Sequence, residues 1–162
     1  VEPVLTWRSA ERLPWGVLIL FGGGLSLAEA IATNGVAEFL GAQASALGGV
    51  SPLLVLVIVV TAIVFLTELT SNTAITAALV PVLAGIAPGL DMDPLLLIVP
   101  AALSASGAFM LPVATPPNAI VFASGEVSIR EMARAGFFLN LVSIALITLV
   151  AWLLIGRVLG GS

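Results

Sequence analysis

A stretch of about 32 residues without any charged side chain, residues 94–125, most limits what this chain can fold into. The hydrocarbon core of a bilayer is about 30 Å thick, and roughly 20 apolar residues in an α-helix cross it. Hydrophobic residues make up 60% of the sequence and charged residues only 9%, whereas soluble domains carry about 25% charged residues. We therefore expect an all-α integral membrane protein.

The residue types that are absent exclude several kinds of chemistry. The sequence has no cysteine and no histidine, which excludes disulfides, a thiolate nucleophile, a His-ligated zinc site and a histidine general base. It has no lysine, and its net charge of −4 is spread without any basic patch, so nucleic acid is not an expected partner. The lipid bilayer is the expected partner of the apolar surface. The protein is not expected to be an enzyme.

Apolar blocks separated by short polar stretches predict the order of the membrane segments. Residues 13–32 predict a first span, in which Pro14 suits a helix start and Trp15 suits the membrane interface. Residues 34–48 have helical apolar spacing but too little apolar length to cross, which predicts an amphipathic helix in the interface. The remaining segments are two arms at 52–67 and 69–90, a span at 94–125 and a last span at 135–156.

Arginines set the expected orientation. Arg8 and Arg12 precede the first span, Arg130 and Arg134 precede the last, and the positive-inside rule places both pairs in the cytoplasm. The two arms then either cross fully around a cytoplasmic turn or meet halfway as a re-entrant hairpin. The hairpin is favoured because no Arg or Lys flanks the tip of the two arms.

We expect a multi-pass protein of the plasma (inner) membrane, with an N-terminal loop and scaffold helix at 1–33, an interfacial helix at 34–50, the hairpin at 51–90, a broken helix at 91–128 and a last helix at 129–162.

Two polar stretches interrupt the apolar blocks at membrane depth: residues 68–76, "ELTSNTAIT", and residues 111–119, "LPVATPPNA". Pro112, Pro116 and Pro117 have no N–H to give the carbonyl four residues back, which predicts a broken helix with an unpaired carbonyl at Ala108. Irregular backbone survives in a membrane only when it is buried in protein or lines a cavity. Free carbonyls attract a cation and free N–H groups attract an anion, so the two breaks predict one shared site for both.

Three stretches carry a resemblance to a known family: "PWGVLILFGGGLSLA", "FLTELTSNTAITAALVPV" and "MLPVATPPNAIVF". Over nearly the whole chain the sequence resembles the C-terminal repeat of the divalent anion:sodium symporter family (DASS, the INDY-type dicarboxylate transporters). The resemblance implies one inverted-repeat half of a secondary transporter, which couples Na⁺ to the symport of di- or tricarboxylates such as succinate by an elevator-type movement. The start at Val1 rather than Met also suggests a piece of a longer protein.

The resemblance also implies partners and site residues. The partners are a small carboxylate anion, the missing N-terminal repeat, and a second copy of the full-length protein in a homodimer. A transport unit, residues 51–157, would move against a scaffold that includes the first span. Sodium would be bound at Thr67, Thr70, Asn72 and the backbone of Ala114. The substrate would be bound by Ser71, Asn72, Thr73, Thr115, Pro116 and Asn118.

Other interpretations of these residues stay open. The threonine hydroxyls at the tip also suit hydrogen bonds to helix carbonyls, and Ser71 also suits a helix cap. Glu68 has three candidate partners, namely a backbone N–H, a solvent cavity and a group on the missing half. Asn140 is expected to form an interhelical hydrogen bond. The alternative functions are a related anion permease, a sodium/proton antiporter of similar architecture and a non-transporting membrane scaffold subunit.

Overall fold

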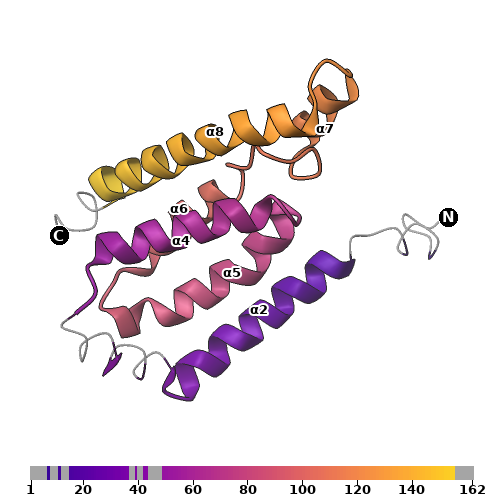
Figure 1. Ribbon diagram of the computed structural model, residues 1–162. Helices are drawn as coiled ribbons and strands as arrows, with labels where there is room; N and C mark the ends of the chain where they lie inside the picture. The colour runs from indigo at the N-terminus through magenta and orange to yellow at the C-terminus, as the bar shows by residue number, and fades with distance from the viewer. Residues whose placement is uncertain are drawn as a thin grey trace.

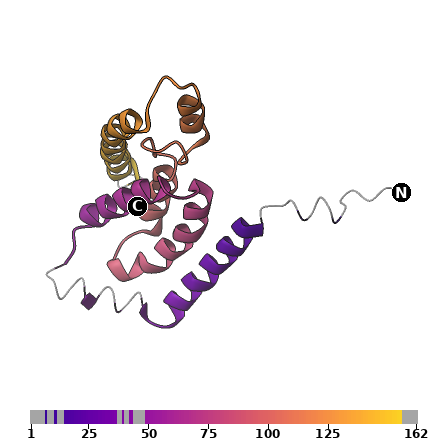
Figure 2. The same ribbon diagram turned by 45° about the vertical axis from the view of Figure 1, so that its right-hand side comes forward.

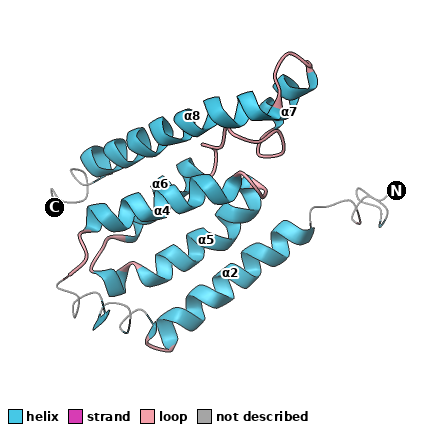
Figure 3. Cartoon of the chain, viewed as in Figure 1, coloured by secondary structure: helices cyan, strands magenta, loops and turns pink. Residues whose placement is uncertain are grey.

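The computed structural model describes Trp7, Glu11, residues 15–36, Phe39, Ala42, Gln43 and residues 49–155. Regular structure in these residues is entirely helical, and Figure 3 shows no strand among them. The amphipathic helix expected at 34–48 falls largely outside the described residues, as do Arg8, Arg12 and Arg157.

The helices follow the order of the apolar blocks. They are α2 (Trp15–Thr33), α4 (Pro52–Thr67), α5 (Asn72–Ile86), a 3₁₀ helix (Pro88–Leu90), α6 (Pro94–Ser104), α7 (Pro116–Ala123) and α8 (Ile129–Val150), which continues as a π-helical turn (Ala151–Ile155). In Figures 1 and 2, α2 packs against α5, and α4 lies between α5 and α8. Within the described residues, Ile129–Leu154 is the one stretch long and apolar enough to cross a membrane as a helix.

Helix α4 occupies the centre of this arrangement because it packs on both sides. Ile63 belongs to an apolar cluster with residues of α5 and α6. Val60 and Val64 belong to a second cluster with Ile144 of α8. Inside a bilayer the lipid is as apolar as these side chains, so close packing rather than exclusion of water holds such helices together. The turn that follows α4 is therefore attached to a helix fixed from two directions.

Helix α8 begins earlier than the span predicted at 135–156. Ser128 and Glu131 form a capping box, in which the Glu131 N–H donates to Ser128 Oγ at 3.3 Å and the Ser128 N–H donates to Glu131 Oε2 at 2.9 Å. This cap satisfies N–H groups that would otherwise lack partners at the helix end. The helix therefore starts at Ile129 and includes Arg130 and Arg134 in its first two turns.

An irregular segment, residues 105–115, separates α6 from α7. Its position differs from the expectation that prolines interrupt the helix, because α6 already ends at Ser104. Pro116 and Pro117 are the first residues of α7, where a missing N–H leaves no helical bond unmade. The Ala108 carbonyl, expected to be unpaired, accepts a hydrogen bond from Asn118 Nδ2 at 3.1 Å. The prolines thus fix where α7 starts, and other contacts hold the irregular segment.

Candidate functional site: the hairpin turn and the irregular segment

The hairpin turn, residues 68–71, joins α4 to α5. Just before it, the buried hydroxyl of Thr67 donates to the Val64 carbonyl at 3.0 Å. Within the turn, the exposed hydroxyl of Thr70 donates to the Leu66 carbonyl at 3.0 Å. These are the helix-carbonyl bonds that the sequence left open as an alternative role for the threonines. A hydroxyl that donates its hydrogen keeps oxygen lone pairs, so both oxygens can still coordinate a cation.

Asn72 begins α5 and has an unusual environment. Its side-chain oxygen Oδ1 is buried and has no hydrogen-bond partner among the residues that the structure describes. Ser71, at the N-cap position, makes no side-chain capping bond, and both Ser71 and Thr73 are exposed. A buried acceptor without a partner costs about 1–3 kcal/mol, so such an atom calls for an explanation. Coordination of a cation is one explanation, because an amide carbonyl oxygen is a suitable cation ligand.

Glu68, in the turn, reaches across to the irregular segment. The N–H groups of Phe109 and Met110 both donate to Glu68 Oε1 at 2.9 Å. The Leu111 N–H donates to Oε2 at 2.9 Å. Asn140 Nδ2, from α8, also donates to Oε1 at 2.7 Å. Of the three partners considered for Glu68, backbone N–H groups are the ones it has, and only 3% of the residue is exposed.

Three consecutive backbone N–H groups around one carboxylate form an anion-binding nest. The nest is filled from within the chain, because Glu68 lies 41 to 43 residues before its donors. Hydrogen bonds to a charged group contribute about 1.5–3 kcal/mol each, more than bonds between neutral groups. The nest therefore fastens the hairpin turn to an irregular segment whose backbone would otherwise lack partners.

Helix α8 completes this arrangement through two residues one helical turn apart. Asn140 is fully buried, and its Oδ1 accepts a second bond from the Phe109 N–H at 3.1 Å. Asn140 was expected to bond to another helix, but its partners Glu68 and Phe109 lie in the hairpin turn and in the irregular segment. At Gly136, a Cβ would collide with the backbone carbonyl of Phe109. Glycine at this position thus lets the irregular segment lie directly on α8.

The C-terminal part of the irregular segment is held by α7. Asn118 Nδ2 donates to the carbonyls of Ala108 and Leu111, at 3.1 and 3.0 Å. The Thr115 side chain caps α7 and accepts from the Asn118 N–H at 3.4 Å. Asn118 and Ala114 are buried at 9% and 6% exposure, whereas Pro116 is exposed. Asn118 therefore closes a loop of backbone next to the Glu68 nest.

The predicted site residues are brought together only indirectly. Among the residues that the structure describes, no hydrogen bond joins Thr67, Thr70 or Asn72 to residues 112–118; the connection between the two parts passes through Glu68. No pattern in the sequence indicates a role for Gly136, and the role of Glu68 stays open there. Glu68 does carry a signal, since it is the one charged residue between Glu38 and Asp91. Within the described ranges, no cluster of three or more Asp, Glu, His or Cys side chains could hold a metal.

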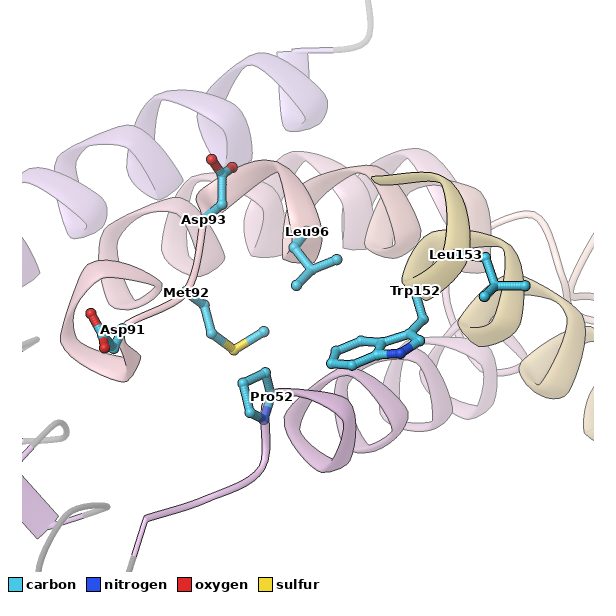
Figure 4. Close-up of a pocket in the computed structure, with 7 residues that line it drawn as sticks. All are labelled: Pro52, Asp91, Met92, Asp93, Leu96, Trp152 and Leu153. Carbon is cyan, nitrogen blue, oxygen red and sulfur yellow. The ribbon is translucent and has the colours of Figure 1, made fainter. Parts of the chain in front are cut away.

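Two hollows differ in their relation to this site. One, of about 530 Å³, contains the predicted substrate residues Thr115 and Pro116, and is lined by Pro112, Val113, Thr115, Pro116, Ala119 and Phe122. The other, of about 440 Å³, lies where α4 begins, at the opposite end of that helix from Glu68. Figure 4 shows Met92 and Trp152 projecting into it, while the Asp93 carboxylate points away. Only the first hollow adjoins the segment that carries predicted site residues.

Comparisons with known proteins agree on one family. The chain matches the description "Sodium:sulfate symporter transmembrane region" over residues 1–160. It is 51% identical over 157 residues to the sodium-dependent dicarboxylate transporter SdcS of Staphylococcus saprophyticus, covering 97% of this chain and 30% of the relative. It is 50% identical, with the same coverage, to the transporters of that name from Staphylococcus aureus strains MRSA252 and USA300. The chain thus spans about 30% of the length of these relatives.

Proposed function

This chain belongs to the sodium:sulfate symporter family, and from that premise we propose that it is the C-terminal part of a sodium-coupled symporter of di- or tricarboxylates. The family is one of membrane transporters rather than enzymes. The relatives are named as sodium-dependent dicarboxylate transporters, and we infer the ion and the substrate class of this chain from those names. The single observation in the structure that supports this proposal most is the buried, unpartnered Oδ1 of Asn72 in the Ser71-Asn72-Thr73 stretch.

The proposed sodium ligands are the oxygens of Thr67, Thr70 and Asn72, with the backbone carbonyl of Ala114. Uncharged oxygens of this kind suit a hard cation. Asn72 Oδ1 has no competing hydrogen bond, and the two threonine oxygens keep free lone pairs. A bound sodium ion would remove the cost of the unpaired Asn72 oxygen and supply positive charge to a site without Lys, Arg or His side chains.

The proposed substrate ligands are Ser71, Asn72 and Thr73 from the hairpin turn with Thr115 and Pro116 from the irregular segment. Ser71, Thr73 and Pro116 are exposed, so a ligand can reach them. Asn118 has a different proposed role, because its amide already bonds to the Ala108 and Leu111 carbonyls. Asn118 would hold the irregular segment in position, and its side chain would lie beside the substrate without being one of its main ligands.

The proposed architecture is that of an inverted-repeat transporter. Helices α4 and α5 have 16 and 15 residues, about 22–24 Å each at 1.5 Å per residue. This is short of the roughly 30 Å bilayer core, which supports a hairpin that enters and leaves from one side. The transport unit would comprise residues 51–157 and move by an elevator mechanism against a scaffold with α2. The full-length protein would be a multi-pass homodimer of the plasma membrane.

The proposed function is tested by uptake of radiolabelled succinate into proteoliposomes that contain the full-length transporter. We expect uptake to follow an inward sodium gradient and to fall to the level of empty vesicles when choline replaces sodium. Movement of sodium driven by a proton gradient, without uptake of any anion, would instead favour a sodium/proton antiporter. Transport of neither anion nor sodium, by protein that is folded and monodisperse, would favour a scaffold subunit and overturn the proposal.

Topology gives an independent prediction. The chain has no cysteine, so single cysteines in it report directly on accessibility. Cysteines at Ala46 and Asp91 are expected to react with an impermeant thiol reagent added to intact cells, whereas one at Ser128 is not. The reason is that the positive-inside rule predicts a cytoplasmic position for the arginine pairs that precede the first and last spans, and Ser128 lies next to the second pair. Labelling of Ser128 from outside would reverse the orientation.

A further inference from the structure

We propose that Glu68 is a positioning residue, which ties the hairpin turn to the irregular segment and to α8 so that the two parts of the binding site keep one geometry. The proposal rests on the proposed function, since it concerns the geometry of that same site. It assigns no contact between Glu68 and either sodium or substrate. Its basis is the set of hydrogen bonds that converge on one buried carboxylate.

The position of Glu68 connects the two groups of proposed ligands. Thr67 immediately precedes it and Thr70 follows two residues later, so any displacement of Glu68 displaces the sodium side of the site. Its donors, the N–H groups of residues 109–111, belong to the backbone that Asn118 holds through the Ala108 and Leu111 carbonyls. A continuous series of hydrogen bonds therefore runs from the hairpin turn to the first turn of α7, which Thr115 caps.

The chemistry of the nest requires a carboxylate. Within the described residues, all four hydrogen bonds to Glu68 are donated by N–H groups, three to Oε1 and one to Oε2. An ionised carboxylate has acceptors on both oxygens, whereas an amide has an acceptor on one side only. In Glu68→Gln, one side-chain NH₂ would face either the Leu111 N–H or the other three donors. The isosteric substitution therefore breaks the nest without changing its volume.

Asn140 completes the tie and is oriented by it. Its Nδ2 donates to the Glu68 carboxylate and its Oδ1 accepts from the Phe109 N–H. If the amide were reversed, its oxygen would face the Glu68 carboxylate and its NH₂ would face the Phe109 N–H, and both hydrogen bonds would be lost. Asn140→Asp would place a second carboxylate against Glu68 at this buried position. The double variant Glu68→Gln with Asn140→Asp returns one carboxylate and one amide to the pair, with their places exchanged. The new NH₂ at position 68 then faces position 140 but still opposes the Phe109 and Met110 N–H groups, which donate to the same Oε1 in wild type.

The test uses the full-length transporter and compares wild type with Glu68→Gln, Asn140→Asp and the double variant. Each protein is first checked for a single peak in size-exclusion chromatography. We then expect Glu68→Gln to raise both the sodium concentration at half-maximal uptake and the KM for succinate about tenfold. Asn140→Asp is expected to raise them further, because two carboxylates then face each other. The double variant is expected to recover to about the level of Glu68→Gln, because it removes the second carboxylate from the pair but keeps the amide at position 68.

Ser104→Ala provides the matched control. Ser104 is fully buried and its hydroxyl bonds only to the Pro100 carbonyl within α6, at 2.6 Å. Its loss is expected to leave both constants within twofold of wild type. If Glu68→Gln lowers only the amount of folded protein and leaves both constants unchanged, Glu68 has a merely structural role and the proposal is wrong. Absence of recovery in a folded double variant would also overturn the pairing of Glu68 with Asn140.

Hydrogen exchange separates failure of this inference from failure of the proposed function. In ligand-free protein, the amides of residues 109–111 are expected to exchange slowly in wild type and at least tenfold faster in Glu68→Gln, while amides within α4 are unchanged. This measurement needs no transport. Fast exchange of these amides in wild type would contradict the nest itself, whereas slow exchange in a wild-type protein without sodium-driven uptake would contradict only the proposed function.

Discussion

Residues 1–162, reconstituted alone into proteoliposomes, are expected to show no sodium-driven succinate uptake. The chain spans about 30% of the length of its dicarboxylate-transporting relatives. The hollow beside Thr115 and Pro116 is open, so a carboxylate held there would keep one side in contact with solvent or lipid. In inverted-repeat transporters the binding site forms between the two repeats, and one repeat alone leaves the site incomplete. We expect the loss to be complete rather than partial.

Co-expression supplies the control for this prediction. Residues 1–162 expressed together with the rest of the full-length transporter are expected to recover part of the sodium-driven uptake, since no new contact is needed beyond those of the intact protein. Robust uptake by residues 1–162 alone, together with labelling of a cysteine at Ser128 from both membrane faces, would instead show an antiparallel homodimer of a complete half-sized transporter.

Asn72→Ala in the full-length protein is expected to weaken the binding of sodium and of succinate together. The variant removes the one proposed ligand shared by both, whose Oδ1 has no other partner in the structure. Loss of a buried hydrogen-bonding group costs about 1–3 kcal/mol, which corresponds to roughly a 5- to 150-fold change in each dissociation constant. Calorimetric titration of the purified transporter with each ligand measures both constants directly.

Two further variants show where such an effect comes from. Thr67→Ala is expected to act mainly through sodium, because Thr67 is fully buried and is proposed to bind only the cation. Thr148→Val is the matched control, since Thr148 Oγ1 is the other buried side-chain atom without a partner among the described residues, and it lies on α8. Sodium and succinate constants that stay unchanged in Asn72→Ala and Thr67→Ala would remove this site from the account.

The sequence predicts those parts of the fold that depend on side-chain type. The uncharged stretch at 52–67 has the same bounds as α4, because Pro52 suits the first helical position and the polar residues after Thr67 form a turn. The last helix was expected at 129–162, but its apolar block, 135–156, begins six residues after α8 does. Hydropathy excludes Arg130 and Arg134 from a span, although the Ser128 cap begins the helix before them. Apolar length therefore locates a helix better than it locates the helix ends.

The irregular segment shows why part of the site could not be predicted. Pro116 and Pro117 explain the start of α7, but α6 ends at Ser104, before Pro112, Pro116 and Pro117. Three of the four donors to Glu68 are backbone N–H groups. Every residue except proline carries such a group, so no side-chain pattern marks residues 109–111 as an anion nest. The close approach at Gly136 likewise depends on how α8 packs. Tertiary contacts alone show that these residues meet.

The account's central claim, that the hairpin turn and the irregular segment hold sodium and carboxylate side by side, is tested most directly by linkage between the two ligands. Calorimetric titration of the full-length wild-type protein with succinate, in saturating sodium and in choline, measures this coupling. Adjacent binding predicts a dissociation constant at least about fivefold lower in sodium, in the range of 1–3 kcal/mol for coupled sites. A succinate affinity that is the same in sodium and in choline would contradict the claim.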